Sequence, residues 1–260
     1  MAESFLGKAG IITGASSGIG RAIAQNLGAA GMELWLVGRS TSELQLTAEA
    51  IAAAGGPRAH CAPLDLAQAG ALAGLVDRVG EQHPYLFCLI NNAGVMYPEP
   101  MTEAATARWQ EMLAINLRTP MESCAAAVRQ MRRHGKPAHL VNVSSLAGRE
   151  YNYGAYGVSK AALTHLGRTL RHELQRDDIR ITTVIPGGFA TQLSRGFDAG
   201  SLDKLQTVSA SLGLDLTGPD VRKILGDPAH IAGTIRHVLE LPIEINFEEI
   251  TIRPAIDLSL

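Results

Sequence analysis

The sequence predicts an α/β fold, a single-domain Rossmann-type doubly wound parallel sheet of about seven strands with helices on both faces. Short apolar runs alternate with longer helical patterns along the 260 residues, and a glycine-rich turn follows the first apolar run. Strands separated by helices of about ten or more residues pair in parallel through right-handed crossovers. Ligands of such sheets bind outside the carboxyl ends of the strands, so the functional residues are expected there.

Local signals in the chain delimit each element. The run 55–57 (Gly-Gly-Pro) ends the second helix, and Gly135 and Pro137 end the fifth. Asp227 and Pro228 begin the last helix, because aspartate caps a helix and proline suits its first turn. The expected strands are 9–13, 33–37, 58–63, 85–90, 139–143, 180–185 and an alternating run at 246–254. The expected helices are 19–30, 42–54, 68–82, 106–116, 119–133, 155–175 and one that begins at 227–228.

No repeat, low-complexity segment or linker divides the chain, so residues 1–260 are expected to form one NAD(P)-binding domain. Within it, residues 192–225 contain four glycines suited to hinges and are expected to form a substrate-binding lid.

The composition and charge of the chain argue against several classes of function. A formal net charge of −2 argues against a general nucleic-acid binder, and a hydrophobic content of 46% indicates an ordinary globule. The sequence shows neither a signal-peptide pattern nor an apolar run of membrane-spanning length, so we expect a cytoplasmic protein with no membrane partner. The three cysteines are widely spaced among apolar residues and are expected to be reduced core residues. We expect no metal site, because none of them has a Cys or His partner at zinc spacing.

The turn 13–20 reads Thr-Gly-Ala-Ser-Ser-Gly-Ile-Gly and joins the first strand to the first helix. Glycines at this position let the backbone approach a pyrophosphate, and the N-terminus of the following helix faces the anion. The spacing is Gly-x3-Gly-x-Gly rather than the commoner Gly-x-Gly-x-x-Gly. We therefore expect a dinucleotide site that involves Gly14, Ser16, Ser17, Gly18, Ile19 and Gly20.

The end of the second strand predicts which dinucleotide binds. In NAD-preferring folds an acidic residue near this position takes the ribose 2′-hydroxyl. This chain has Arg39 there, followed by Ser40. A guanidinium suits bidentate phosphate contact, so Arg39 is expected to bind the 2′-phosphate and to favour NADP(H) over NAD(H).

The stretch from Ser144 to Lys160 leaves the fifth strand and enters a helix. Tyr156 and Lys160 stand four residues apart, so they share one face of that helix. A phenol beside an ammonium loses its proton more easily than a free one, whose pKa is about 10, which suits proton transfer near neutral pH. A hydroxyl from Ser144 or Ser145, at the end of the strand, is expected to meet the same substrate oxygen.

Six motifs in order make the chain resemble the short-chain dehydrogenase/reductase family, in its subgroup of roughly 250 residues. The resemblance covers residues 8 to about 191 and the final strand. The matching motifs are the glycine turn, Asp65 in Leu64-Asp65-Leu66, Asn91-Asn92-Ala93-Gly94, Asn116 in Ile115-Asn116-Leu117, the pair Tyr156 and Lys160, and 186–191 (Pro-Gly-Gly-Phe-Ala-Thr). For the cofactor, the resemblance adds contacts from Asp65, Leu66, Asn92, Ala93, Gly94, Tyr156, Lys160, Pro186, Gly187 and Thr191.

The resemblance implies hydride transfer between a nicotinamide and a carbonyl carbon. Tyr156 would donate the proton and Ser145 would hydrogen-bond the oxyanion. Lys160 would bind ribose hydroxyls, and Asn116 would hold a helix kink and a water for proton relay. Ser145 matches the catalytic serine of the motif, yet the segment between it and the tyrosine is about two residues shorter than is common in the family, which keeps Ser144 open.

The resemblance also implies a small carbonyl or alcohol substrate and a homotetramer or homodimer. A non-catalytic NADP-sensing or scaffold protein on the same fold is the alternative, although such a protein needs neither Tyr156 nor Lys160. An epimerase of the longer branch generally uses Gly-x2-Gly-x2-Gly, and a kinase-like module needs Gly-Lys-Ser/Thr; the turn here has neither pattern.

Overall fold

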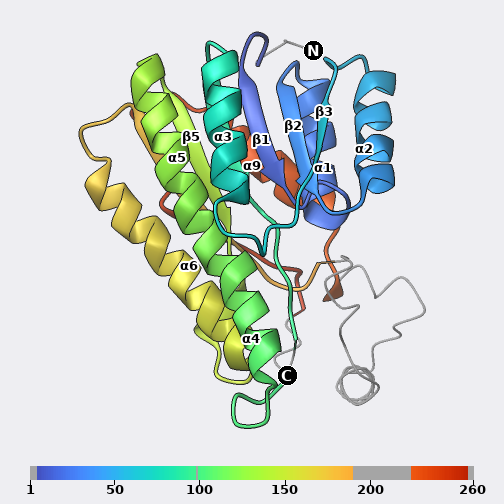
Figure 1. Cartoon of the computed structure of the whole chain (residues 1–260), viewed down its shortest axis with the longest axis vertical. Helices are drawn as coiled ribbons and strands as arrows, with labels where there is room; N and C mark the ends of the chain where they lie inside the picture. Colours follow the sequence, from blue (N-terminus) through green and yellow to red (C-terminus); the bar gives the residue numbers. More distant parts are fainter. Residues whose placement is uncertain (1–4, 98, 190–223, 257–260) are drawn as a thin grey trace.

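A computed structural model describes residues 5–97, 99–189 and 224–256. Across them, seven parallel strands form one sheet in the order β3-β2-β1-β4-β5-β6-β7 (Figure 1). This confirms the predicted doubly wound parallel sheet. The strands are β1 (Ala9–Thr13), β2 (Glu33–Gly38), β3 (His60–Pro63), β4 (Leu86–Asn91), β5 (Ala138–Val143), β6 (Ile179–Pro186) and β7 (Glu249–Ile252).

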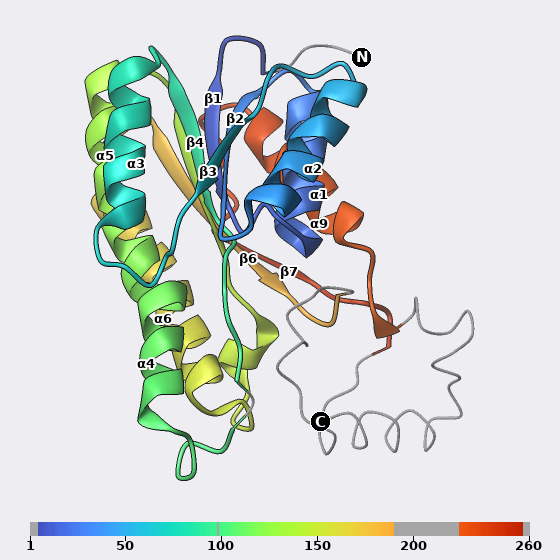
Figure 2. The ribbon, with the colours of Figure 1, turned by 45° about the vertical axis from the view of Figure 1, so that its right-hand side comes forward.

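Helices cover both faces of the sheet. Figure 2 shows α1, α2 and α9 on one face and α3, α5 and α6 on the other. The helical segments are α1 (Gly18–Ala29), α2 (Thr41–Ala53), α3 (Ala71–Gln82), α4 (Thr106–Leu113), the π-helix η1 (Ala114–Arg118), α5 (Thr119–His134), the 3₁₀-helix η2 (Leu146–Arg149), α6 (Gly154–Glu173) and α9 (Pro228–Glu240). None of the helices in these ranges is long and apolar enough to cross a membrane.

The strand order reverses between β1 and β4. The chain builds the sheet outward from β1 through β2 to β3, then returns to place β4 on the other side of β1. The connections after these two central strands therefore diverge at the carboxyl edge. Such a switch point is where doubly wound sheets bind nucleotides.

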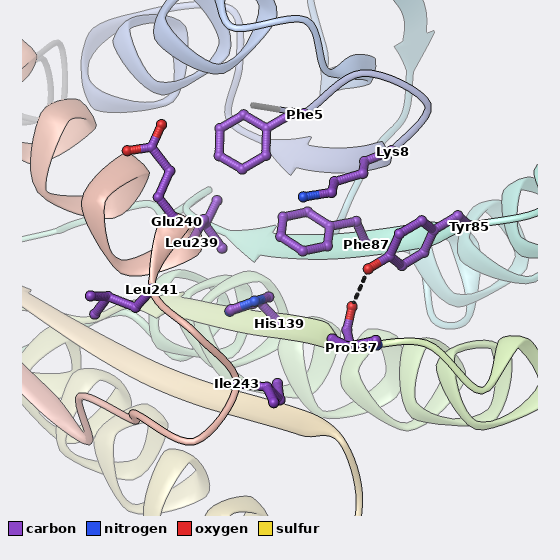
Figure 3. Close-up of a pocket in the computed structure, with 10 residues that line it drawn as sticks. All are labelled: Phe5, Lys8, Tyr85, Phe87, Pro137, His139, Leu239, Glu240, Leu241 and Ile243. Atoms are coloured by element: carbon purple, nitrogen blue, oxygen red, sulfur yellow. Dashed lines mark hydrogen bonds between the residues drawn. The ribbon is translucent and has the colours of Figure 1, made fainter. Parts of the chain in front are cut away.

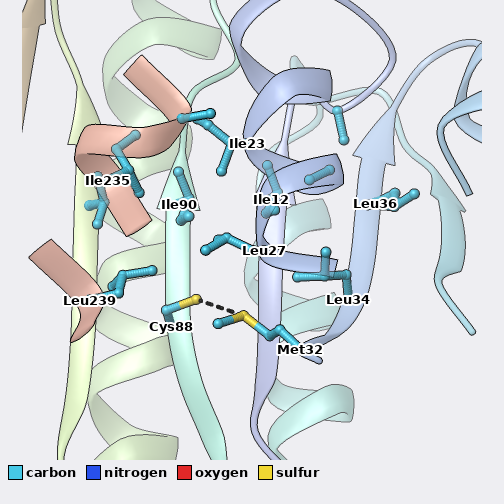
Figure 4. Close-up of a cluster of buried hydrophobic side chains, with 14 of the residues drawn as sticks. Ile12, Ile23, Leu27, Met32, Leu34, Leu36, Cys88, Ile90, Ile235 and Leu239 are labelled. Atoms are coloured by element: carbon cyan, nitrogen blue, oxygen red, sulfur yellow. Dashed lines mark hydrogen bonds between the residues drawn. The ribbon is translucent and has the colours of Figure 1, made fainter. Parts of the chain in front are cut away.

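The hydrophobic core is divided between the two faces. One cluster joins α1 and α9 to the sheet through side chains such as Ile12, Ile23 and Ile235 (Figure 4). A second cluster lies beneath α3 and α5 on the opposite face. Cys88 and Cys124 are buried as expected, but Cys61 is only half-buried because its strand, β3, is an edge strand.

Two helix boundaries, the start of α3 and the end of α4, differ from the sequence prediction by more than two residues. Helix α3 begins at Ala71 rather than at residue 68, because Gly70 adopts a left-handed conformation with φ 74°. The two helices expected around 106–133 are joined without a break by η1, whose wider π turn contains Asn116. Short π segments inside α-helices occur frequently at functional sites.

A cavity of about 450 Å³ lies at the amino ends of the strands (Figure 3). We call it the amino-end cavity; its lining comprises Phe5, Lys8, Tyr85, Phe87, Pro137, His139, Leu239, Glu240, Leu241 and Ile243. The Lys8 Nζ lies 4.5 Å from the ring centroid of Phe87 and 5.2 Å from that of Phe5. Tyr85 donates a hydrogen bond of 2.7 Å to the Pro137 carbonyl. The cavity is thus at the edge of the sheet opposite the predicted ligand site.

Candidate active site

The glycine turn is hydrogen-bonded to the segment that follows β4. Thr13 Oγ1 accepts hydrogen bonds of 2.9 Å from the backbone N–H groups of Asn92 and Ala93. The Asn92 Nδ2 donates to the Thr13 carbonyl at 2.9 Å. A Cβ at Gly14, where φ is 69°, would lie 2.7 Å from that Nδ2. The two predicted motifs therefore meet at the switch point, and glycine at position 14 permits the close approach.

Arg21 holds the glycine turn against α2 through its guanidinium. Its guanidinium donates to the Ser16 carbonyl, pairs with the Glu43 carboxylate at 2.6 Å and donates to Thr47 Oγ1 at 3.0 Å. The Thr47 hydroxyl in turn donates to the Ala15 carbonyl at 2.9 Å. These contacts fix the turn against α2.

The N-terminus of α1 suits an anion. Ser17 is its N-cap residue but makes no side-chain capping bond, and the first turn contains no acidic residue. The backbone N–H groups of a first helical turn have no partner within the helix and attract negative charge. Gly18, with φ 52°, lies at the start of this turn. This arrangement can hold a phosphate group.

Arg39 is exposed at the end of β2. Among the described residues it makes no hydrogen bond or ion pair, although its charge reaches the phenol of Tyr97. The hydrogen bond to Glu111 raises the pKa of Tyr97, and the charge of Arg39 acts in the opposite direction. Ser40 beside it caps α2 by accepting a hydrogen bond of 3.3 Å from the Glu43 N–H. The guanidinium is thus available to a ligand, whereas the Ser40 oxygen already has a structural role.

Asp65 and Leu66 follow β3 at the same edge. Asp65 is exposed, and its Oδ1 accepts a hydrogen bond of 2.9 Å from the Ala67 N–H. Leu66 is buried, and its carbonyl accepts a hydrogen bond of 2.6 Å from Thr119 Oγ1. A hydrogen bond within the segment and one from Thr119 of α5 therefore hold these two predicted cofactor-binding residues in place.

Tyr156 and Lys160 are both buried on α6, with relative exposures of 3% and 4%. The Lys160 Nζ donates a hydrogen bond of 2.9 Å to the Val143 carbonyl at the end of β5 and lies 5.8 Å from the Tyr156 ring centroid. Desolvation lowers the pKa of Lys160 to about 8. An ammonium has three donors, so two of them remain unused among the described residues.

The expectation that the Tyr156 phenol loses its proton more easily than a free phenol is wrong for this structure. Burial raises the pKa of the Tyr156 phenol to about 12, a hydrogen bond from Ser145 lowers it by a smaller amount, and the nearby Tyr153 raises it. The reason is that desolvation of the phenolate outweighs the stabilisation that its neighbours supply. The phenol therefore keeps its proton at neutral pH.

The two candidate serines have different surroundings. Ser145 lies beside the Tyr156 hydroxyl, and its Oγ accepts a hydrogen bond of 3.2 Å from the Ala147 N–H. Ser144 is buried and points to α6, where its Oγ donates to the Lys160 carbonyl at 2.8 Å and contacts Thr164 Oγ1 at 2.8 Å. The geometry thus brings Ser145, and not Ser144, to the phenol.

Asn116 lies in η1 and is fully buried. Its amide exchanges two hydrogen bonds of 2.9 Å with the backbone of Val95. Its Nδ2 also donates to Ser159 Oγ at 3.0 Å, and that hydroxyl donates to the Tyr156 carbonyl at 2.7 Å. A Cβ at Gly94 would lie 3.3 Å from the Asn116 oxygen and 3.5 Å from Lys160 Nζ, so these motifs converge.

Two supporting residues were not predicted from the sequence. Ser159 links Asn116 to the backbone of Tyr156, and Thr13 links the glycine turn to Asn92. Their signals were a serine directly before Lys160 and a threonine that opens the turn. Neither residue type in such a place distinguishes a structural hydroxyl from an ordinary polar residue.

The predicted nicotinamide turn is described only in part. Pro186 ends β6, and the Gly187 N–H donates a hydrogen bond of 2.8 Å to the Ile252 carbonyl of β7. Thr191 and most of the predicted lid, 192–223, lie outside the described residues. Within the described ranges no group of three or more His, Cys, Asp or Glu side chains is arranged to hold a metal ion.

Sequence comparison agrees with the motifs. The pattern of the family described as short chain dehydrogenase matches residues 8–201. An uncharacterized oxidoreductase of Staphylococcus saprophyticus is 28% identical over 249 residues, which cover 95% of this chain and 97% of that one. One from Staphylococcus haemolyticus is also 28% identical, over 250 residues with the same coverage.

Solved structures agree with the fold. A metagenomic short-chain oxidoreductase in complex with NADP has a TM-score of 0.78 and 27% identity and covers 98% of this chain and 100% of its own. An alcohol dehydrogenase from the archaeon Thermococcus sibiricus, complexed with 5-hydroxy-NADP, has a TM-score of 0.80 and 26% identity, with coverages of 97% and 99%. A short chain dehydrogenase from Burkholderia cenocepacia in complex with NADP has a TM-score of 0.79 and 26% identity, with coverages of 96% and 97%.

Proposed function

The chain belongs to the short-chain dehydrogenase/reductase family of oxidoreductases, and from that premise we propose that it interconverts a ketone or aldehyde and an alcohol by using NADP(H). The observation that carries the proposal is the burial of Tyr156 and Lys160 on α6, with the Ser145 hydroxyl near the phenol and Gly94 close to the lysine. This group lies at the carboxyl edge of the sheet, and a Cβ at Gly94, in the segment that is hydrogen-bonded to the glycine turn through Asn92 and Ala93, would lie 3.5 Å from Lys160 Nζ. A carbonyl oxygen placed there would meet two hydroxyl donors.

In this mechanism a bound nicotinamide supplies the hydride, and the chain supplies the proton and the positioning. Tyr156 holds its proton at neutral pH, because its pKa is about 12, and donates it to the substrate oxygen during reduction. Ser145 donates a hydrogen bond to the same oxygen as charge develops on it. Lys160 keeps two donors for ribose hydroxyls, and its positive charge favours the phenolate that remains.

Asn116 completes the proposed catalytic group. Its two hydrogen bonds to Val95 hold η1 against the segment after β4, and its Nδ2 reaches Ser159 beneath Tyr156. We assign it the role of holding a water that returns a proton towards the phenol. The π turn of η1 supports this role, because short π segments inside α-helices occur frequently at functional sites.

The preference for NADP(H) rests on Arg39. The guanidinium is exposed at the end of β2 and has no ion-pair partner among the described residues, so it can pair with a 2′-phosphate. The relatives from Thermococcus sibiricus and Burkholderia cenocepacia were solved with 5-hydroxy-NADP and NADP respectively, which supports the same cofactor here. The cytoplasmic location, the substrate lid at 192–225 and the homotetramer or homodimer stay predictions.

The direct test is a panel of ketones, aldehydes and hydroxy acids followed at the absorbance of reduced nicotinamide with NADPH, NADH and their oxidised forms. We expect turnover of at least one carbonyl or alcohol, with the phosphorylated cofactor preferred. Tight NADPH binding without turnover of any member of the panel would favour the alternative, a non-catalytic NADP-sensing protein. A clear preference for NADH would contradict the assignment of Arg39.

A further inference from the structure

We propose that Glu249 is a positioning residue, whose carboxylate holds the loop of Ser145 against the helix that carries Tyr156. The proposal rests on the proposed reductase function and adds to it a residue from the far end of the chain. Glu249 is the first residue of β7 and lies 89 or more positions after every residue of the proposed acid–base group, which comprises Asn116, Ser145, Tyr156 and Lys160.

The Glu249 carboxylate binds two arginines from different elements. Its Oε2 accepts a hydrogen bond of 2.8 Å from the Arg149 guanidinium, and its Oε1 accepts one of 2.6 Å from Arg168 Nε. Arg149 also donates to Thr251 Oγ1 at 3.2 Å. The hydrogen bond from Arg168 and the one from Arg149 lower the pKa of Glu249, which keeps the carboxylate charged at neutral pH. One side chain of β7 thus joins η2 to α6.

Arg149 is connected to the reacting hydroxyls through a very short element. It is the last residue of η2, a single turn that begins at Leu146, directly after Ser145. The Ala147 N–H in this turn donates to Ser145 Oγ at 3.2 Å, and the same Ser145 hydroxyl is near enough to the Tyr156 phenol to affect its pKa. A shift of Arg149 therefore changes the direction in which the Ser145 hydroxyl points.

The inner side of η2 packs tightly on α6. A Cβ at Gly148 would lie 2.7 Å from the Ala161 nitrogen, and a Cβ at Gly157 would lie 2.8 Å from the Ala147 carbonyl oxygen. Packing so close resists inward movement of the turn. The ion pairs of Glu249 act on the outer side, where they resist movement away from the helix.

The short length of the loop explains why the position of Ser145 depends on the ion pairs of Glu249. The segment from Ser145 to Tyr156 contains eleven residue steps, about two fewer than the family commonly has, and it includes the fully exposed Tyr151. A short connection transmits displacement of one end to the other. Misplacement of a reacting group by about 1 Å can cost up to about a hundredfold in rate.

The test compares Glu249→Gln with a matched control, Glu248→Gln. Glu248 is the adjacent carboxylate and also pairs with an arginine of α6, Arg171, at 3.5 Å, but it does not contact Arg149. Because the arginines of the Glu249 pairs are half-exposed, we expect a moderate loss in Glu249→Gln, a kcat about three- to tenfold lower, with an unchanged Kd for NADPH. Glu248→Gln should keep the wild-type kcat and Kd.

Combining Arg149→Gln with Glu249→Gln tests whether the two residues affect kcat through the same contact or through separate losses of stability. Arg149→Gln should lower kcat by a similar factor, and Arg149→Gln combined with Glu249→Gln should lose no more than the larger single loss. Independent, multiplying losses would overturn the proposal, as would a wild-type kcat in Glu249→Gln or an equal loss in Glu248→Gln.

Amide hydrogen exchange tests the same proposal without turnover. The Ala147 and Gly148 N–H groups donate to the side chain and carbonyl of Ser145, so their exchange reports the loop directly. Both should exchange several-fold faster in Glu249→Gln and at the wild-type rate in Glu248→Gln. If the wild-type protein reduced no carbonyl, the proposed function would fail, while unchanged exchange in Glu249→Gln would overturn the positioning role itself.

Discussion

The two ends of the parallel strands, which we call the amino edge and the carboxyl edge of the sheet, bury polar groups in different ways. At the amino edge, Arg180 donates to the carbonyls of Pro242 at 2.8 Å and Leu241 at 3.0 Å, and its Nη2 lies 3.1 Å from His139, while its Nε lacks a partner. At the carboxyl edge, Lys160 makes one described hydrogen bond, to Val143, and lies beside the paired hydroxyls of Ser145 and Tyr156. The amino edge uses most of its donors internally, whereas the carboxyl edge keeps donors for a ligand.

The pKa values of one buried group at each edge, His139 and Lys160, show the same contrast. Burial and the charge of Arg180 lower the pKa of His139 to about 3, so this side chain stays neutral throughout the physiological range. Burial lowers the pKa of Lys160 only to about 8, so the amine titrates close to neutral pH. Burial of an ionisable group alone therefore does not indicate a site. The useful sign is a buried group with unused donors beside hydroxyls that can move a proton.

The largest expected effect on turnover comes from removing one hydroxyl oxygen at the carboxyl edge, and removing one at the amino edge is its control. Tyr156→Phe should lower turnover by about 10²- to 10⁴-fold, because general acid catalysis contributes that much. Binding of NADPH should persist. Tyr85→Phe removes the hydroxyl that bonds Pro137 in the amino-end cavity and should leave turnover near the wild-type value. The comparison fails if Tyr156→Phe retains substantial activity in steady-state assays.

Next in size is the comparison of the adjacent serines. Ser145→Ala should lower kcat by about 10²- to 10³-fold, as the loss of a preorganised oxyanion donor does. Ser144→Ala removes hydrogen bonds to the Lys160 carbonyl and Thr164, and should lower the free energy of unfolding by about 1–3 kcal/mol while activity remains. Kinetics and denaturant unfolding of both variants measure this. Loss of turnover in Ser144→Ala alone would reverse the assignment.

Arg39→Ala should raise the KM for NADPH by about ten- to a hundredfold, since a charged hydrogen bond contributes roughly 1.5–3 kcal/mol. The KM for NADH should stay nearly constant, because that cofactor has no 2′-phosphate. Arg58→Ala, at an exposed arginine elsewhere in the chain, is the matched control and should change neither value. Equal effects of Arg39→Ala on both cofactors would refute the 2′-phosphate contact.

The smallest effect concerns stability at the amino edge. The unfolded chain protonates His139 near its ordinary pKa of 6.5, and the folded chain near 3, so the unfolded state binds more protons between these values. Stability therefore falls as pH drops from about 6.5 towards 3. Between pH 7 and 4.5 the wild type should lose about 2 kcal/mol more unfolding free energy than His139→Gln.

Chemical denaturation at both pH values measures the difference, with His165→Gln, at an exposed histidine of α6, as the control. Turnover of His139→Gln at pH 7 should match the wild type. An identical pH dependence in His139→Gln and the wild type would show that this buried imidazole does not contribute to acid sensitivity.

The sequence predicts the sheet well, because each buried strand is a short apolar run and each crossover contains a helical period. It places the glycine turn and the pair on α6 correctly in the fold, since both depend on local spacing. It fails where the decisive interaction is distant in sequence. The π turn of η1, the start of α3 at Gly70 and the link from Glu249 to Arg149 all depend on backbone geometry or tertiary contacts.

The pKa of Tyr156 shows the same limit for chemistry. The four-residue spacing correctly brings Lys160 near the ring, but the sequence does not report how completely the phenol is buried. Desolvation then outweighs the neighbouring groups and raises the pKa. The choice between Ser144 and Ser145 likewise depends on which way each side chain points from the end of β5.

The most direct test of the central claim is a crystal structure of the protein with NADP⁺ bound. We expect the nicotinamide ring to lie against Tyr156, with Lys160 Nζ hydrogen-bonded to the ribose and Arg39 at the 2′-phosphate. A pyridine ring bound away from the Tyr156 hydroxyl, with no space for a carbonyl between them, would contradict it.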